Sequence, residues 1–312
     1  MFTKSRPLQL DAYLESLYRY FPSELIQTYI IYKVELFNEE YKKLFQKHSG
    51  SIVINESDFH SDFLGILNRV NTKYILFGID DVVYFDSVDY EMIDRAFSEF
   101  ADKIFGFSLR FGNDSLDISS DPIEQRIVAD QNVYSLNWTE GHTPKTRYPF
   151  ELCATIYPAT LVKMIINSMM SNSVLVKSLF SPGSFLIKIL SKVLSSRSIL
   201  KFFGYFFSPN TLESWSCRWC QNHSNKLPGF LFFQKQCASA IQVNMVNMST
   251  LDDKFQEDDE YTVEVLANKY RQGYTFDFDY LTRNKPTGTH CGTEYFKLVQ
   301  DKAVCAPEVD RK

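Results

Sequence analysis

The chain has 312 residues, of which 45% are hydrophobic, and it carries a formal net charge of -5. This length allows one large α/β domain, or one such domain with a smaller addition. The negative charge argues against general nucleic-acid binding, because that activity needs a clustered basic field.

The sequence has no visible pattern of secretion or membrane insertion. Its first residues lack the apolar core of a signal peptide, and no uncharged apolar run reaches the roughly 18 residues that span a bilayer. The six Cys are scattered over the chain, which is typical of reduced proteins. We therefore expect a cytoplasmic location.

Helical and strand patterns alternate through residues 1–112. The spacing of apolar residues predicts a helix at 7–21, a strand at 28–34, a polar helix ending at 47, a strand at 51–54, a helix at 59–70, a strand at 74–77, a helix at 89–100 and a strand at 104–109. Only residues 1–3 precede the first turn, so the opening strand is very short unless the true start lies upstream. The alternation predicts a doubly wound, mainly parallel α/β sheet with right-handed crossovers.

The second half, residues 113–312, lacks this alternation. Between residues 154 and 212 there are six Lys or Arg and no acidic residue. This stretch contains a basic insertion at about 174–207 and, within it, the pattern of a helix at 184–207. Beyond it we expect a helical, partly irregular region: a strand at 240–246, an acidic loop at 252–260, a helix at 262–270 and a mostly irregular tail that closes the site.

The pattern at 184–207 has two interpretations. A helix with a broad apolar face opposite Lys188 and Lys192 suits a membrane interface and is drawn to anionic lipids. The protein would then be peripheral to the inner face of a membrane. Alternatively, the apolar face packs on the sheet or forms a dimer.

Asp80 and Asp81 stand directly after the apolar strand at 74–77, at the sheet edge where α/β proteins bind ligands. Two adjacent carboxylates repel each other and are costly to desolvate unless a positive group binds them. A divalent ion that bridges to a diphosphate meets this need, because Mg²⁺ and Mn²⁺ prefer oxygen ligands. The alternative is structural, with one Asp capping the next helix and the other solvated.

The sequence around these residues resembles a known family. Three segments are similar to nucleotide-diphospho-sugar transferases of the GT-A fold (glycosyltransferase family 2-like). They are Thr3-Lys4-Ser5-Arg6-Pro7-Leu8-Gln9-Leu10, then Leu14-Glu15-Ser16-Leu17, and, after the fourth predicted strand, Phe77-Gly78-Ile79-Asp80-Asp81-Val82. The resemblance covers residues 1–112 well and the remainder loosely. The acidic motif departs from the family's DxD pattern, because Ile79 stands at its first position.

The resemblance implies roles for residues of the first half. Asp81 would hold Mn²⁺ or Mg²⁺, and Asp80 would contact the ribose or a metal-bound water. Thr3 and Arg6 lie in the first strand-to-helix turn, where backbone amides and a guanidinium suit a nucleotide and its phosphates. Asp58 would accept a hydrogen bond from the base or ribose, although it also suits the N-cap of the helix that follows.

Two residues of the second half gain a role in the same way. In several members of this fold a C-terminal His completes the metal shell, and His290 in its polar loop is the best candidate. An inverting transfer, which we expect here, needs a base for the acceptor hydroxyl, and Glu213 near a helix start is the best candidate. Glu213 could instead be an ordinary helix-N-terminal acid. Glu151 and Asp130 are weaker rivals for the base.

The pair Cys217 and Cys220 has the spacing of half a zinc site. Structural zinc needs four ligands, and neither His223 nor Cys237 belongs to a second paired motif. Buried, unreactive thiols are the better interpretation.

The sequence therefore predicts a metal-dependent glycosyltransferase of glycan or cell-surface polysaccharide synthesis. Its partners would be a nucleotide-diphosphate sugar donor and a saccharide or lipid-linked acceptor, with no nucleic acid. One alternative is a metal-dependent nucleotidyltransferase, which would normally carry a Gly-rich loop where this chain has Lys4-Ser5-Arg6-Pro7. Another is a non-catalytic, degenerate domain of the same fold that acts as a binding module.

Overall fold

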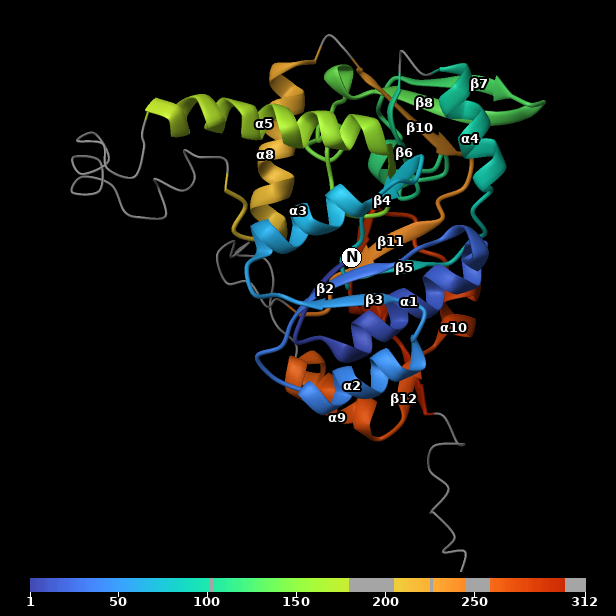
Figure 1. Ribbon diagram of the computed structural model, residues 1–312. Helices are drawn as coiled ribbons and strands as arrows, with labels where there is room; N and C mark the ends of the chain where they lie inside the picture. The colour runs from blue at the N-terminus through green and yellow to red at the C-terminus, as the bar shows by residue number, and fades with distance from the viewer. Residues whose placement is uncertain (101–103, 180–204, 225–226, 245–258, 301–312) are drawn as a thin grey trace, which may run out of the picture.

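The computed structural model describes residues 1–100, 104–179, 205–224, 227–244 and 259–300. Over these ranges the protein is an α/β structure with eight α-helices, one parallel sheet and further sheets of mixed or antiparallel pairing (Figure 1). Among the described helices, none has the length and apolar character needed to cross a membrane.

The first sheet is parallel and comes from the N-terminal part of the chain. Its order is β1-β2-β3, with β1 at Phe2–Lys4, β2 at Tyr29–Lys33 and β3 at Ile52–Asn55. The intervening helices are α1 (Pro7–Tyr20), α2 (Asn38–Lys47) and α3 (Phe59–Arg69). Pro7 suits the first turn of α1, and the apolar residues of that helix recur at the spacing of one face, which is buried.

The second sheet has six strands in the order β4-β9-β6-β10-β8-β7. Four of its five pairings are antiparallel, and only β6 and β10 run parallel. Strands of the second half, β9 and β10, pair with β4 and β6 of the first half, so the two halves share this sheet. The bounds are β4 Tyr74–Leu76, β6 Ile104–Ser108, β7 Ile123–Val128, β8 Gln131–Asn137, β9 Thr155–Pro158 and β10 Gly229–Phe233.

In the described part of the chain, a single bridge beside β1 joins the two sheets. Phe2 forms a parallel bridge with Ile79, and its N–H donates to Gly78 O at 3.0 Å. Gly78 is required here because a Cβ would come within 2.0 Å of the Tyr13 hydroxyl. Phe2 also contacts the rings of α3 and of Phe77, which anchors β1 between the sheets.

The C-terminal elements pack against the N-terminal helices. A small sheet of order β13-β11-β5 joins Val82–Tyr84 (β5), Ala238–Ile241 (β11) and His290–Cys291 (β13). Figure 1 shows the orange and red elements α9, α10 and β12 beside the blue helices α1 and α2. The remaining bounds are α4 Tyr90–Glu99, α5 Ala159–Leu179, α8 Pro209–Asn222, α9 Val263–Arg271, β12 Tyr274–Phe276, α10 Phe278–Arg283 and β14 Leu298–Gln300.

The predicted elements of the first half are confirmed to within a few residues at their ends, and the α/β class is confirmed. The mainly parallel pairing holds for the first sheet but not for the six-stranded one. The predicted strand at 240–246 begins earlier, at Ala238, and the tail expected to be irregular contains β12, α10, β13 and β14. Most of the predicted helix at 184–207 and of the acidic loop at 252–260 lies outside the described residues.

Candidate active site

Asp80 and Asp81 stand at the carboxyl ends of the parallel strands. β4 ends at Leu76, residues 77–79 carry the chain past β1, and β5 begins at Val82. Asp80 is buried, whereas the side chain of Asp81 is 21% exposed. The pair therefore occupies the sheet edge that α/β proteins use for ligands, and Asp81 is the member that reaches solvent.

Arg6 holds the two aspartates together. Its Nη1 donates to Asp80 Oδ1 at 3.0 Å and to Asp81 Oδ1 at 2.6 Å, and its Nη2 donates to the main-chain oxygen of Asn244. The buried Nε has no partner among the described residues. Because one guanidinium faces two carboxylates, the cluster keeps one formal negative charge.

The electrostatics of the cluster leave Asp81 incompletely compensated. Burial raises the pKa of Asp81 to about 6, and the charge of Asp80 adds to this rise while Arg6 opposes it. Burial also works against the charge of Arg6, but the two aspartates outweigh it and raise the pKa of the guanidinium. Arg6 therefore stays positive, and Asp81 carries a charge that a further cation would stabilise.

The turn between β1 and α1 directs Arg6 toward the aspartates. Ser5 has a φ of 51°, in the left-handed region that residues with a Cβ rarely adopt, and its N–H donates to Lys33 O at 3.2 Å. The Tyr41 hydroxyl makes hydrogen bonds of 2.9 Å with Thr3 Oγ1 and with the backbone N–H of Arg6. Tyr41 thus joins Thr3 and Arg6, the two residues of this turn that the sequence assigns to nucleotide binding. Strain of this kind is commonly held at functional sites.

The donor set around Asp81 fits a hard divalent cation. Carboxylate oxygens are the ligands that Mg²⁺ prefers, and Mg²⁺ usually takes one or two carboxylates, with water and phosphate supplying the rest. Within the described ranges no three His, Cys, Asp or Glu side chains form a cluster able to hold a metal. The residues present therefore fit a cation that arrives with a diphosphate better than one caged by protein alone.

Glu213 lies in the first turns of α8. Its Oε1 accepts a hydrogen bond from the Leu152 N–H at 2.9 Å. Burial raises the pKa of the Glu213 carboxyl, and both this hydrogen bond and the charge of Arg110 oppose the rise. A carboxylate with a raised pKa is a stronger base than a solvated one, so its environment suits proton acceptance.

Cys153 is a buried thiol whose pKa responds to charges from both Glu213 and Asp81. Burial raises the pKa of its thiol to about 12, and the charges of Arg110, Glu213 and Asp81 all act on it. Asp81 precedes β5, Arg110 follows β6 and Glu213 lies on α8, so groups from three separate parts of the chain act on this thiol. No pattern in the sequence indicates that these groups act on one buried thiol.

His290 lies on β13, separated from β5 by β11. Ala240 of β11 pairs with Val82 of β5 on one side and with His290 of β13 on the other. At a strand spacing of about 4.8 Å, Val82 and His290 are therefore about 10 Å apart. The imidazole nitrogens lie 3.2 and 3.5 Å from Arg110 Nη1, and burial, together with the charge of Arg110, lowers the pKa of His290 to about 3. The ring is neutral, as a metal ligand must be. Its neighbour is a cation, however, and its role as a ligand remains a prediction.

Asp58 is the N-cap of α3. It accepts hydrogen bonds from the Ser61 N–H at 3.0 Å and the Ser61 hydroxyl at 2.6 Å, and from the Tyr205 hydroxyl. Partial burial works against ionisation, but these hydrogen bonds lower the pKa of Asp58. The capping interpretation is therefore confirmed. Asp58 shares the carboxyl edge of the first sheet with Arg6 but has no hydrogen bond to the Arg6 cluster among the described residues.

The other two candidates for the base lie in different environments. Glu151 is buried and forms an ion pair with Arg110. Asp130 is exposed in the turn between β7 and β8, with a φ of 63°, which is a hairpin conformation. Cys217 and Cys220 are free and buried on α8, and burial raises the pKa of both thiols. The interpretation of this pair as unreactive thiols is consistent with the structure.

Three residues of this region were not singled out in the sequence. Arg110 follows the predicted strand at 104–109 and therefore stands at the same sheet edge as the acids, a signal that could have identified it. Tyr41 looks like an ordinary core residue of a helix, and Asn244 acts through its main chain, which no side-chain pattern reveals.

The fold and the site define an α/β protein in which a buried arginine joins two adjacent carboxylates at the end of a parallel sheet. No model of a protein family matches the chain. The chain is similar to the bifunctional glycosyltransferase pgtA of Dictyostelium discoideum, with 21% identity over 189 residues, which are 53% of this chain and 24% of that protein. The chain thus spans about a quarter of the length of this relative.

Proposed function

We propose that this protein is a glycosyltransferase that moves a sugar from a nucleotide-diphosphate donor to an acceptor hydroxyl and depends on Mn²⁺ or Mg²⁺. The observation that carries the proposal is the cluster of Arg6, Asp80 and Asp81, which keeps one negative charge at the ligand-binding edge of the sheet. The similarity to a glycosyltransferase agrees with it.

On the donor side, Asp81 would hold the metal ion, and Asp80 would contact the ribose or a metal-bound water. The bound ion would supply positive charge to the leaving diphosphate. Thr3 and Arg6 would place the first turn against the nucleotide, and Arg6 would fix the orientation of both carboxylates. The finer assignments, Asp58 to the base or ribose and His290 to the metal shell, belong to the same proposal.

On the acceptor side, Glu213 would act as the base of an inverting transfer. The acceptor oxygen would form a bond with the anomeric carbon while the bond from that carbon to the diphosphate oxygen breaks, and the hydroxyl proton would pass to Glu213. The raised pKa of the Glu213 carboxyl favours this role. The acceptor would be a saccharide or a lipid-linked saccharide bound by the part of the chain after residue 112.

A thermal-shift screen of nucleotide-diphosphate sugars with and without Mn²⁺ tests the proposal. We expect at least one nucleotide sugar to raise the melting temperature only when Mn²⁺ is present, because its diphosphate completes the ion's ligands. Asp81→Asn should abolish this shift. Asp279→Asn, the same change on the exposed face of α10, should retain it.

The opposite results are equally informative. Shifts that occur without metal, or that persist in Asp81→Asn, would contradict the metal-dependent site. An absence of shifts across the screen would favour a binding module of the same fold.

A further inference from the structure

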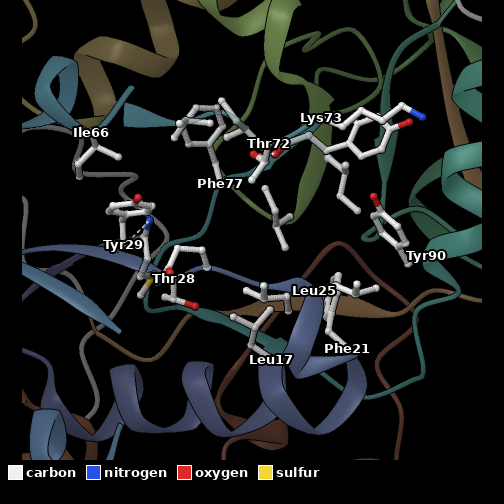
Figure 2. A pocket seen from close by; sticks show the side chains of 18 of the residues that line it. Leu17, Phe21, Leu25, Thr28, Tyr29, Ile66, Thr72, Lys73, Phe77 and Tyr90 are labelled. Carbon is white, nitrogen blue, oxygen red and sulfur yellow. Dashed lines mark hydrogen bonds between the residues drawn. The ribbon is translucent and has the colours of Figure 1, made fainter. Parts of the chain in front are cut away.

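The two ends of β2 and β4 have different surroundings. An apolar cavity of about 420 Å³ lies at the amino ends, opposite the acidic pair. Figure 2 shows Leu17 and Phe21 on one side of it and Ile66 and Phe77 on the other, so α1 and α3 supply apolar walls. At the carboxyl ends the contacts are polar instead, and they centre on the guanidinium of Arg6.

The segment that follows β11 contacts both sides of this ion pair. At the end of β11, the Ile241 N–H donates to the main-chain oxygen of Asp81 at 2.7 Å. Three residues later, the main-chain oxygen of Asn244 accepts a hydrogen bond from Arg6 Nη2. One short segment of the second half therefore holds the backbone of Asp81 and the side chain of Arg6.

The side chain of Asn244 fixes this segment. Its Nδ2 donates to the main-chain oxygen of Tyr261 at 2.7 Å, and its Oδ1 accepts a longer and weaker hydrogen bond of 3.5 Å from Gln9 Nε2. Gln9 comes three residues after Arg6, so both contact Asn244 from the same face of the first turn of α1. Asn244, Gln9 and Arg6 are buried, so water competes little for these hydrogen bonds.

The contact with Asn244 determines how Arg6 shares its charge. A guanidinium commonly binds one carboxylate through two parallel N–H bonds. Here Nη2 is bound by Asn244, and Nε has no partner among the described residues, so Nη1 alone contacts Asp80 and Asp81. Without the Asn244 contact, Nη2 becomes available, and the guanidinium would bind Asp81 through both Nη groups. Fewer lone pairs of Asp81 would then remain for a cation.

We propose that Asn244 is a positioning residue of the candidate site. By holding Arg6 Nη2, it restricts the guanidinium to one bridging nitrogen and leaves Asp81 able to bind a cation. Asn244 acts only through Arg6 in this account. The part that concerns the cation rests on the proposed function, whereas the position of Arg6 involves no ligand.

The residue type at position 244 follows from its two side-chain contacts. The Tyr261 oxygen needs a donor and the Gln9 amide needs an acceptor, and an amide side chain supplies both. In Asn244→Asp, a carboxylate oxygen would replace the donor and face the Tyr261 oxygen, which repels it. Asn244→Ala removes both hydrogen bonds. Gln9→Met removes only the longer one and keeps a side chain of similar length.

NMR of the Arg6 guanidinium in the ligand-free protein tests the position directly. Nη groups held by different partners rotate slowly and give separate ¹H–¹⁵N signals. We expect separate signals in the wild type, and we expect the Nη2 signal to leave its wild-type position in Asn244→Ala and Asn244→Asp. Gln9→Met should give a smaller change and serves if the Asn244 variants do not fold, which circular dichroism reports. The matched control is Asn268→Asp on the exposed face of α9, which should leave both signals unchanged.

Mn²⁺ affinity in the presence of UDP, GDP or ADP tests the consequence for the cation. Outer contacts that orient a metal ligand typically contribute about 10- to 100-fold to metal affinity, so the Kd for Mn²⁺ should rise by about that factor in Asn244→Ala. Electron paramagnetic resonance of free Mn²⁺ measures it. Asn268→Asp should bind Mn²⁺ as the wild type does.

The two readouts separate this inference from the proposed function. Unchanged Arg6 signals in a folded Asn244→Ala protein would overturn the positioning role. Changed signals with an unchanged Kd for Mn²⁺ would overturn its link to the cation. A wild-type protein that binds no Mn²⁺ with any of the three nucleotides would contradict the proposed function, while the Arg6 signals would still decide whether Asn244 positions the guanidinium.

Discussion

The carboxyl and amino ends of the same few strands differ sharply in chemistry. At the carboxyl end, Arg6, Asp80 and Asp81 form a charged cluster whose parts come from two separate turns. At the amino end, the edges of β2 and β4 border an apolar cavity. Within the described residues, β1 joins the two sheets near the charged end, where its turn also directs Arg6. The geometry of the candidate site therefore depends on a strand of three residues.

The largest expected effect comes from removing the charge of Asp81. If the cluster of Arg6, Asp80 and Asp81 binds a metal ion with a diphosphate, Asp81→Asn should lower the rate of sugar transfer by about 10³-fold or more. The reason is that stabilisation of the leaving diphosphate's charge by the metal ion is worth several kcal/mol. Initial rates with the donor identified by thermal shift measure this. Asp279→Asn serves as the matched control, and equal rates in both variants would remove Asp81 from the mechanism.

Glu213→Gln should reduce the transfer rate by about 10²- to 10⁴-fold and leave donor binding unchanged, because it removes the base without altering the acidic pair. The wild-type rate should also fall as pH drops through the raised pKa of Glu213, since the carboxylate must be ionised to accept a proton. A normal transfer rate in Glu213→Gln would show that the transfer does not need Glu213 as its base.

The stability of the polar end should depend on pH through Asp81. Its pKa of about 6 in the folded protein exceeds that of an unfolded Asp, so the favourable contribution is fully present below about pH 4 and is lost as pH rises through 6. Without metal, Asp81→Asn should therefore raise the free energy of unfolding at pH 8 by about 2 kcal/mol, and the gain should vanish near pH 4. Urea unfolding at both pH values checks this, and a loss of stability at pH 8 would mean that Arg6 already compensates both carboxylates.

Tyr41→Phe tests how far the turn between β1 and α1 depends on the Tyr41 hydroxyl. The change removes the hydroxyl that joins Thr3 to the Arg6 N–H and leaves a buried donor unpaired, which should cost about 1 to 2 kcal/mol of unfolding free energy. Donor affinity should fall as well, because the turn loses its anchor. Unchanged stability and affinity would show that Ser5 and Pro7 fix the turn unaided.

Asp58→Asn should have the smallest effect on stability. Asn caps helices about as well as Asp, so the free energy of unfolding should change by less than about 0.5 kcal/mol. A drop in nucleotide affinity at constant stability would support a contact with the base or ribose. Unchanged affinity would leave Asp58 as the cap of α3 and nothing more.

The elements of the first half could be predicted because local patterns determine them. Apolar runs such as Tyr74–Phe77, bounded by turn residues, identify strands without knowledge of their partners. β4 is nevertheless only half-buried, although its sequence is apolar, because one edge borders the cavity. The second half was harder, because β10 inserts between β6 and β8 from far along the chain. β13 has two residues and depends on pairing with β11.

The part of the candidate site that lies directly after strands could be predicted from the sequence. Asp80, Asp81 and Arg6 follow strands, and the structure brings them into contact. The geometry of Glu213 and His290 depends on tertiary packing around Arg110, which the sequence does not specify. Charge patterns identify candidate groups, but the distances between them come from long-range pairing.

The most direct test of the central claim is electron paramagnetic resonance of Mn²⁺ with the protein and a nucleoside diphosphate. The cluster's single uncompensated charge predicts that the free Mn²⁺ signal decreases to a one-to-one endpoint only when the diphosphate is present, and that Asp81→Asn abolishes the decrease. A signal that stays free at every concentration of diphosphate, or that decreases equally in Asp81→Asn, would contradict the account.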